Sequence, residues 1–128
     1  QFQNLIHLDV SQCRIQNAAN NFAQLPMLKI LNISNNYIRC VAPLSKLPLE
    51  DIDASFNFIE EVKGFSSLKI GYFQHNLLKR VDIRGDLDYL NLNFNDFDKY
   101  AKDNITEAGV DLISHETTFV VIKSVKKL

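Results

Sequence analysis

Apolar residues recur along the chain in an eleven-residue pattern that appears five times. In each copy the first, fourth, sixth and eleventh places are mainly apolar, and the ninth place holds Asn or Cys. The copies begin at Leu5, Leu28, Leu49, Leu68 and Leu87, so the spacings between them are 23, 21, 19 and 19 residues. Apolar places separated by single polar ones predict a short strand in each copy, with one face buried and one exposed.

This pattern, LxxLxLxxNxL, resembles the signature of leucine-rich repeats, and its spacings fall within the range of that family. The resemblance implies repeats that stack side by side to form one parallel sheet and one continuous apolar core, with each repeat stabilised mainly by its neighbours. We therefore expect an α/β fold that is mostly β: a right-handed leucine-rich repeat solenoid with the parallel sheet on its concave face.

The ninth place of the pattern predicts a ladder of buried polar side chains. The chain leaves the strand sharply there, and a buried carboxamide can satisfy backbone groups that the turn leaves unpaired. The ladder positions are Cys13, Asn36, Asn57, Asn76 and Asn95. Cys13 is expected to be a small, buried structural thiol.

Apolar residues between the copies predict return arms that close the core on the convex side. These residues are Phe22 and Leu25, Val41 and Leu44, Val62 and Phe65, and Val81 and Ile83. Only 8 residues separate Leu78 from Leu87, which is too few for an α-helix of ordinary length. The convex arms should therefore be short and extended or 3₁₀.

The pattern divides the chain into five repeats, residues 1–97, and a carboxy-terminal cap or extension, residues 98–128. Within the second part, residues 117–125 have a strand-like composition. The amino end begins inside a convex arm, without the polar cap that covers the end of a solenoid. We expect a carboxy-terminal fragment of a longer repeat protein, or a chain that self-associates through its uncapped amino end.

Composition and motifs argue against several functional classes. The formal charge is −1 and no basic stripe is present, so nucleic acid is not an expected partner. No apolar run approaches the ~18 residues of a transmembrane span, so no membrane insertion is expected within this stretch. The 4 glycines form no phosphate-binding loop, and the three histidines lack metal-ligand spacing. We expect no cofactor, no metal and no enzymatic activity.

Two carboxylates are candidates for acid–base chemistry. Asp51 and Asp53 lie two residues apart on one predicted strand, with both side chains on the concave side. An acid–base pair needs members in different environments. These two look equally solvated, so we expect them to be surface charges.

The concave face, read from the third, fifth, seventh and eighth places, predicts a protein-binding surface. Its last three repeats gather aromatic and apolar residues beside Asp51 and Asp53: Phe56, Ile70, Tyr72, Tyr89 and Phe94. Tyrosines of this kind are typical anchors of protein interfaces. For Phe56 and Phe94 a second interpretation carries equal weight, in which their rings fold down against neighbouring turns.

A narrower resemblance covers residues 28–98. The segment LNLNFNDFDKY, in particular Asn95-Asp96-Phe97-Asp98, is similar to the close of the mosquito complement-like leucine-rich immune proteins, with Lys99 where that group has Cys. LEDIDASFNFIEEVKG, residues 49–64, resembles an internal repeat of the same group. This likeness implies a secreted recognition protein that binds other immune proteins.

Two alternatives stay open. The spacing of Asn57, Ile59 and Val62 also resembles intracellular repeat proteins that regulate phosphatases, and bacterial internalin-like surface adhesion proteins. These imply a cytoplasmic scaffold or an adhesion module. The sequons at Asn32 and Asn104 favour a secreted glycoprotein. Cys40 should face outward, so a disulfide with Cys13 is not expected.

Overall fold

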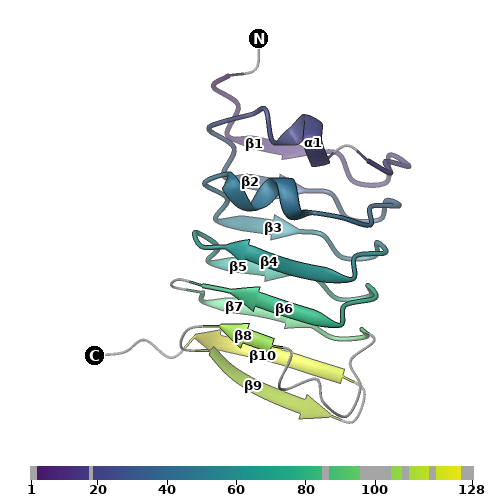
Figure 1. The fold of residues 1–128 in the computed structure, drawn as a ribbon, viewed down its shortest axis with the longest axis vertical. Coiled ribbons are helices and arrows are strands. Elements are labelled where there is room, and N and C mark those ends of the chain that lie inside the picture. Colours follow the sequence, from purple (N-terminus) through teal and green to yellow (C-terminus); the bar gives the residue numbers. More distant parts are fainter. Residues whose placement is uncertain are drawn as a thin grey trace.

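The computed structural model describes residues 3–17, 19–84, 87–95, 105–107, 110–115 and 118–124. The chain winds into a solenoid in which short strands of successive turns lie side by side (Figure 1). The elements in chain order are β1 (His7–Asp9), α1 (Ala19–Phe22), β2 (Ile30–Asn32), the 3₁₀ helix η1 (Ala42–Lys46), β3 (Asp51–Asp53), β4 (Glu61–Phe65), β5 (Ile70–Tyr72), β6 (Arg80–Ile83), β7 (Tyr89–Leu92), β8 (Ile105–Glu107), β9 (Val110–His115) and β10 (Thr118–Ser124).

The strands form two sheets that face each other across the core. The larger sheet has seven strands in the order β1-β2-β3-β5-β7-β10-β9, and the smaller has three in the order β4-β6-β8. Strands β1 to β7 of the larger sheet are parallel, whereas β10 runs antiparallel to β7. The expectation of a mostly β solenoid with a parallel sheet is confirmed.

The register of the parallel strands places equivalent positions of the repeats in columns. The third places of the five copies pair from strand to strand in the sequence His7, Ile30, Asp51, Ile70 and Tyr89. The fourth places lie between them on the opposite face, and Leu31, Ile52 and Leu90 are buried there. The columns read from the sequence are therefore the columns of the sheet.

Gly71 departs from the apolar pattern at the fourth place for a reason of volume. A Cβ atom at Gly71 would lie 2.9 Å from the ring of Phe73 and 3.0 Å from Leu90 Cδ1. Phe73 is the largest residue in the sixth column and is fully buried. The missing side chain thus makes room for the Phe73 ring, and the core stays filled without overpacking.

The return arms differ from one repeat to the next. The predicted core residues of these arms are buried or packed against the core. The third and fourth arms are the strands β4 and β6, and the second is the 3₁₀ helix η1, so the prediction of extended or 3₁₀ arms is confirmed there. The first arm instead contains α1, a four-residue α-helix, since the first spacing, 23 residues, is the longest.

The predicted asparagine ladder is present and buried. In each full rung the carboxamide joins two turns, as Asn57 shows. Its Nδ2 donates to Ile33 O of the preceding turn at 2.9 Å and to Ala54 O and Ser55 O of its own turn. Its Oδ1 accepts the Ile38 N–H at 3.0 Å. Asn36, Asn76 and Asn95 make equivalent contacts.

The prediction of a buried Cys13 is wrong, because this thiol is exposed. Its backbone N–H is held by Asn36 Oδ1 at 2.9 Å, so Cys13 does occupy the ladder column. Its Sγ donates only to Ser11 O, at 3.2 Å, within its own turn. Among the described residues, β1 pairs with β2 alone, so no strand on its other side covers this position.

The strand expected in residues 117–125 is observed as β10, which pairs antiparallel with β7 through Phe119 and Leu92, Val120 and Asn91, and Val121 and Leu90. Residues 96–104 and 125–128 lie outside the described residues. The boundary between repeats and cap at residues 97 and 98 therefore stays a prediction.

Replacing one ladder carboxamide should destabilise the whole stack. Asn57→Ala leaves the buried Ile38 N–H unpaired and removes one of the hydrogen bonds to each of Ile33 O, Ala54 O and Ser55 O, so we expect a loss of about 1–3 kcal/mol in the free energy of unfolding. Chemical denaturation measures it, with Asn20→Ala in the exposed part of α1 as a matched control. Equal stabilities for the two variants would contradict a structural role for the ladder.

Backbone protection should increase along the solenoid. Leu5, Leu8 and Val10 are only partly buried, whereas Leu90 and Leu92 are fully buried in β7, which is paired on both sides. The first three amides should therefore exchange hydrogen faster than the last two, as measured by NMR-detected exchange. Uniform protection would show that the turns open only as one unit.

Candidate functional site

The exposed face of the parallel strands, here called the outer sheet face, is formed by the third and fifth places. These are the positions that the sequence assigned to the concave surface. Five of the residues gather on β3, β5 and β7 and define what we call the tyrosine patch: Asp51, Asp53, Ile70, Tyr72 and Tyr89. Asp51, Ile70 and Tyr89 form one row across the three strands, and Asp53 and Tyr72 pair in the next row.

The two tyrosines of the patch support each other. The ring centroids of Tyr72 and Tyr89 lie 5.4 Å apart with their planes tilted by 49°. Asn91 Nδ2 donates to the Tyr89 hydroxyl at 3.3 Å. Both side chains are half-buried, so each keeps part of its ring open to a partner, and the hydroxyl of Tyr89 is already partly fixed in position.

The seventh column contributes less to this face than the sequence interpretation expected, since two of its residues are buried and Ser11, Gln74 and Asn93 are half-buried. Ser34 and Ser55 are buried, and their hydroxyls donate to the fifth-place side chains Asn32 and Asp53 at 2.7 Å and 2.6 Å. The same fifth-place oxygens accept the serine backbone N–H groups. In each pair the Asn or Asp side chain accepts the backbone N–H two residues further on, which is an Asx turn. This turn ends the strand and places the serine side chain inside the molecule.

The fourth repeat lacks this pair because Tyr72 replaces the Asn or Asp. Gln74 fills the seventh place of this repeat, and its Oε1 is buried without a hydrogen-bond partner among the described residues. In the fifth repeat Asn91 Oδ1 still accepts the Asn93 N–H at 3.0 Å, while Asn93 Oδ1 is buried without a partner among the described residues. The tyrosine patch thus lies where the regular polar turn is interrupted. The half-buried ring of Tyr72 takes the place of a side chain that would accept hydrogen bonds from the seventh-place residue.

The two carboxylates of the patch are both half-buried, as equal solvation would require, but they differ in their hydrogen bonds and neighbouring charges. Asp53 Oδ1 accepts two hydrogen bonds from Ser55. Burial raises the pKa of Asp51, the nearby Asp53 charge raises it further, and His7 acts in the opposite direction. Asp9 accepts the same two hydrogen bonds, here from the backbone N–H and the hydroxyl of Ser11. These hydrogen bonds lower the pKa of Asp9.

The eighth column forms a turn edge with an unusual backbone. Its five residues share a left-handed conformation with φ between 55° and 57°: Gln12, Asn35, Phe56, His75 and Phe94. Asn tolerates this conformation, but a phenylalanine there is strained. The sequence pattern shows that these positions form a column and gives no sign of this backbone.

Three rings of the eighth column stack in one continuous pile. The centroids of Phe56 and His75 lie 4.2 Å apart, those of His75 and Phe94 lie 4.4 Å apart, and both pairs are within 12° of parallel. Phe56 and Phe94 are nevertheless 47% and 59% exposed. The interpretation that these rings pack against neighbouring turns holds in part, because they stack and still face solvent, and their role in a protein interface stays a prediction.

Other chemical features of the described residues are few. Residues 3–95, as far as they are described, contain no group of three or more His, Cys, Asp or Glu side chains arranged to hold a metal ion. Cys40 is exposed as predicted, and neither it nor Cys13 is in a disulfide. No helix in the described part of the chain is long and apolar enough to cross a bilayer.

These features define a class: a parallel β-solenoid of stacked turns, joined by an asparagine ladder, that exposes an aromatic and acidic patch on its sheet face. No family model, no curated protein and no solved structure matches the chain. The class is therefore assigned from the geometry of the turns.

The raised pKa of Asp51 predicts that Asp51→Asn is stabilising at neutral pH. Ionising Asp51 costs more in the folded than in the unfolded chain, so this destabilisation is absent well below the ordinary pKa of 3.8 and complete once pH exceeds the raised value. Because the side chain is partly exposed, the rise in melting temperature at pH 7 should be only about 1–2 °C.

The measurement is thermal unfolding of the variant and the parent at pH 7 and near pH 3, where the difference should vanish. Glu61→Gln, an exposed carboxylate of β4, is the control. A variant less stable than the parent at pH 7 would mean that Asp51 makes a favourable ionic contact.

Proposed function

We propose that the chain is a leucine-rich repeat recognition module that binds a protein partner through the tyrosine patch and performs no catalysis. The observation that carries the proposal is the pairing of Tyr72 with Tyr89, 5.4 Å apart on adjacent strands beside Ile70. Tyrosine buries a large area with little loss of side-chain freedom, and its hydroxyl can serve a polar partner. The ladder and the repeat pattern support the family assignment.

The acidic residues give the patch a charge preference. Asp51 and Asp53 lie in the two rows next to Ile70 and Tyr72, so the partner surface should offer apolar groups flanked by basic or hydrogen-bond-donating ones. Asp51 is already partly desolvated, as its raised pKa indicates. A basic side chain from the partner would remove that penalty on binding.

The setting that we favour is secreted innate-immune recognition, supported by the sequence resemblance and by the sequon at Asn32. Asn32 lies on β2, beside Asp53 and with β3 between it and the two tyrosines, and its Oδ1 is held by Ser34. A glycan on Asn32 Nδ2 would shield the β1–β2 half of the outer sheet face and leave Tyr72 and Tyr89 open. Asn104 lies outside the described residues.

Removing both tyrosine rings should abolish most of the affinity. The double variant Tyr72→Ala, Tyr89→Ala is expected to lose about 2 kcal/mol or more of binding free energy if the rings are anchors. The partner is isolated by affinity capture on the parent chain, purified, and titrated calorimetrically against each variant. His7→Ala, in the same column but on β1, should change the affinity little.

The melting temperature of the double variant is measured in parallel to check its fold. If the double variant is poorly folded, Tyr89→Phe, which retains the ring, is titrated in its place. Equal affinity for the double variant and the parent would move the binding site to the convex arms or to residues 119–125. A captured partner of cytoplasmic origin would favour an intracellular regulatory scaffold, and a host-cell surface partner would favour a bacterial adhesion module.

A further inference from the structure

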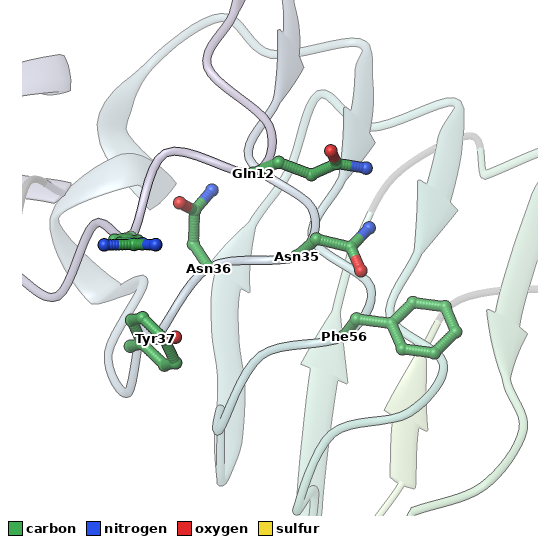
Figure 2. A pocket seen from close by; sticks show the side chains of 6 residues that line it. Gln12, Asn35, Asn36, Tyr37 and Phe56 are labelled. Atoms are coloured by element: carbon green, nitrogen blue, oxygen red, sulfur yellow. The ribbon is translucent and has the colours of Figure 1, made fainter.

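The ring stack of the eighth column ends in an open ring face at Phe56. Two further eighth places follow toward the amino end, and they hold Asn35 and Gln12 instead of rings. All have the same left-handed φ, so their side chains leave the turn in one direction, as Figure 2 shows for Gln12, Asn35 and Phe56. Since Asn35 is too short to cover a ring, Phe56 stays 47% exposed.

This open face borders a shallow depression of about 340 Å³. It is lined by Gln12, Arg14, Asn35, Asn36, Tyr37 and Phe56. In Figure 2 the Phe56 ring is seen face on, with none of the labelled side chains across it. The lining therefore offers two aromatic rings, those of Phe56 and Tyr37, three carboxamides and a single charged group.

The spacing of the solenoid fits one more ring at this place. Neighbouring strands lie about 4.8 Å apart, which is close to the stacking distances of 4.2 Å and 4.4 Å found between the three rings. Phe56 and Gln12 are two rungs apart, so a ring laid on Phe56 has about one rung of space before it meets the Gln12 carboxamide.

We propose that this depression binds an aromatic side chain of a protein partner, which stacks on the open face of Phe56 as the fourth ring of the column. The carboxamides of Asn35 and Gln12 would then be in place to hydrogen-bond to a polar tip such as a tyrosine hydroxyl. The site lies at the turn edge and not on the outer sheet face. It is thus separate from the tyrosine patch.

The charge of the lining indicates which kind of residue should lie next to the aromatic residue of the partner. Arg14 is the charged residue of the depression, and none of the ion pairs between described residues involves it. A carboxylate next to the aromatic residue would therefore find a free guanidinium. A nucleotide fits less well, because one arginine on a chain of net charge −1 provides a weak phosphate footprint.

The test uses N-acetyl-tyrosine, which combines the ring and the carboxylate, titrated into isotope-labelled protein and followed by NMR. We expect saturable shifts centred on the side-chain amides of Asn35 and Gln12. The neutral N-acetyl-tyrosinamide should bind more weakly, and N-acetyl-leucine, which has the carboxylate without the ring, more weakly still.

Three variants separate the parts of the site. Phe56→Leu should weaken N-acetyl-tyrosine binding about fivefold, the size of effect expected for loss of one ring stack. Asn35→Phe should abolish binding, because its own ring would occupy the slot, and this backbone conformation already holds phenylalanine at Phe56 and Phe94. Arg14→Gln should remove the preference for N-acetyl-tyrosine over its amide.

Met27→Ala, which removes an apolar side chain that is 45% exposed elsewhere, should leave binding unchanged. If Phe56→Leu fails to fold, Asn35→Phe decides the matter alone. The proposal is overturned by an absence of saturable binding, by parent-like binding in Asn35→Phe, or by shifts centred on Tyr72 and Tyr89. Tighter binding of adenosine monophosphate than of N-acetyl-tyrosine at the same residues would replace the peptide ligand with a nucleotide.

Discussion

The carboxamide at the ninth place is the interaction on which the rest of the structure depends. Each one contacts three carbonyl oxygens and at least one N–H group in two successive turns, as Asn36 and Asn57 show. These backbone groups lie where the chain turns out of the strand, and some of them, such as Ile33 O and the Ile38 N–H, are bound by ladder carboxamides alone, whereas Ser34 O and Ser55 O also accept a backbone N–H from the preceding turn. A side chain with both donors and an acceptor is needed to satisfy them. Because each amide reaches into the neighbouring turn, it also fixes how one turn sits on the next.

The surface inherits its order from this constraint. The residue before each ladder asparagine has the same left-handed φ to within two degrees, from Asn35 to Phe94. For a phenylalanine this conformation costs on the order of 1 kcal/mol, and a stacked aromatic pair returns a similar amount. The Phe56, His75 and Phe94 stack is therefore a consequence of the backbone repeat, which sets rings down at nearly the distance that stacking requires.

Much of this could be read from the sequence, because a strict period fixes columns without any knowledge of their contents. The ladder, the buried places and the residues of the tyrosine patch follow from counting. Burial at Cys13 did not follow, since it depends on whether another strand covers β1. The different environments of Asp51 and Asp53 depend on one serine two residues away. The sequence shows that the three residues of the ring stack occupy one column. Only the left-handed backbone explains why their side chains run parallel.

The ladder does not by itself determine which turn stacks on which, because its asparagines are alike and would make the same contacts in any order of the turns. The second places alternate in charge: Lys29, Glu50, Lys69 and Asp88. In the native order Glu50 and Lys69 come within 3.9 Å, and the twelfth places add Glu60 and Lys79 at 3.6 Å. Such exposed pairs contribute at most ~1 kcal/mol each. If a turn were skipped, however, Lys29 would lie beside Lys69 and Glu50 beside Asp88. The alternating charges therefore add little to stability, and they favour the native order over the skipped one by a difference of similarly small size.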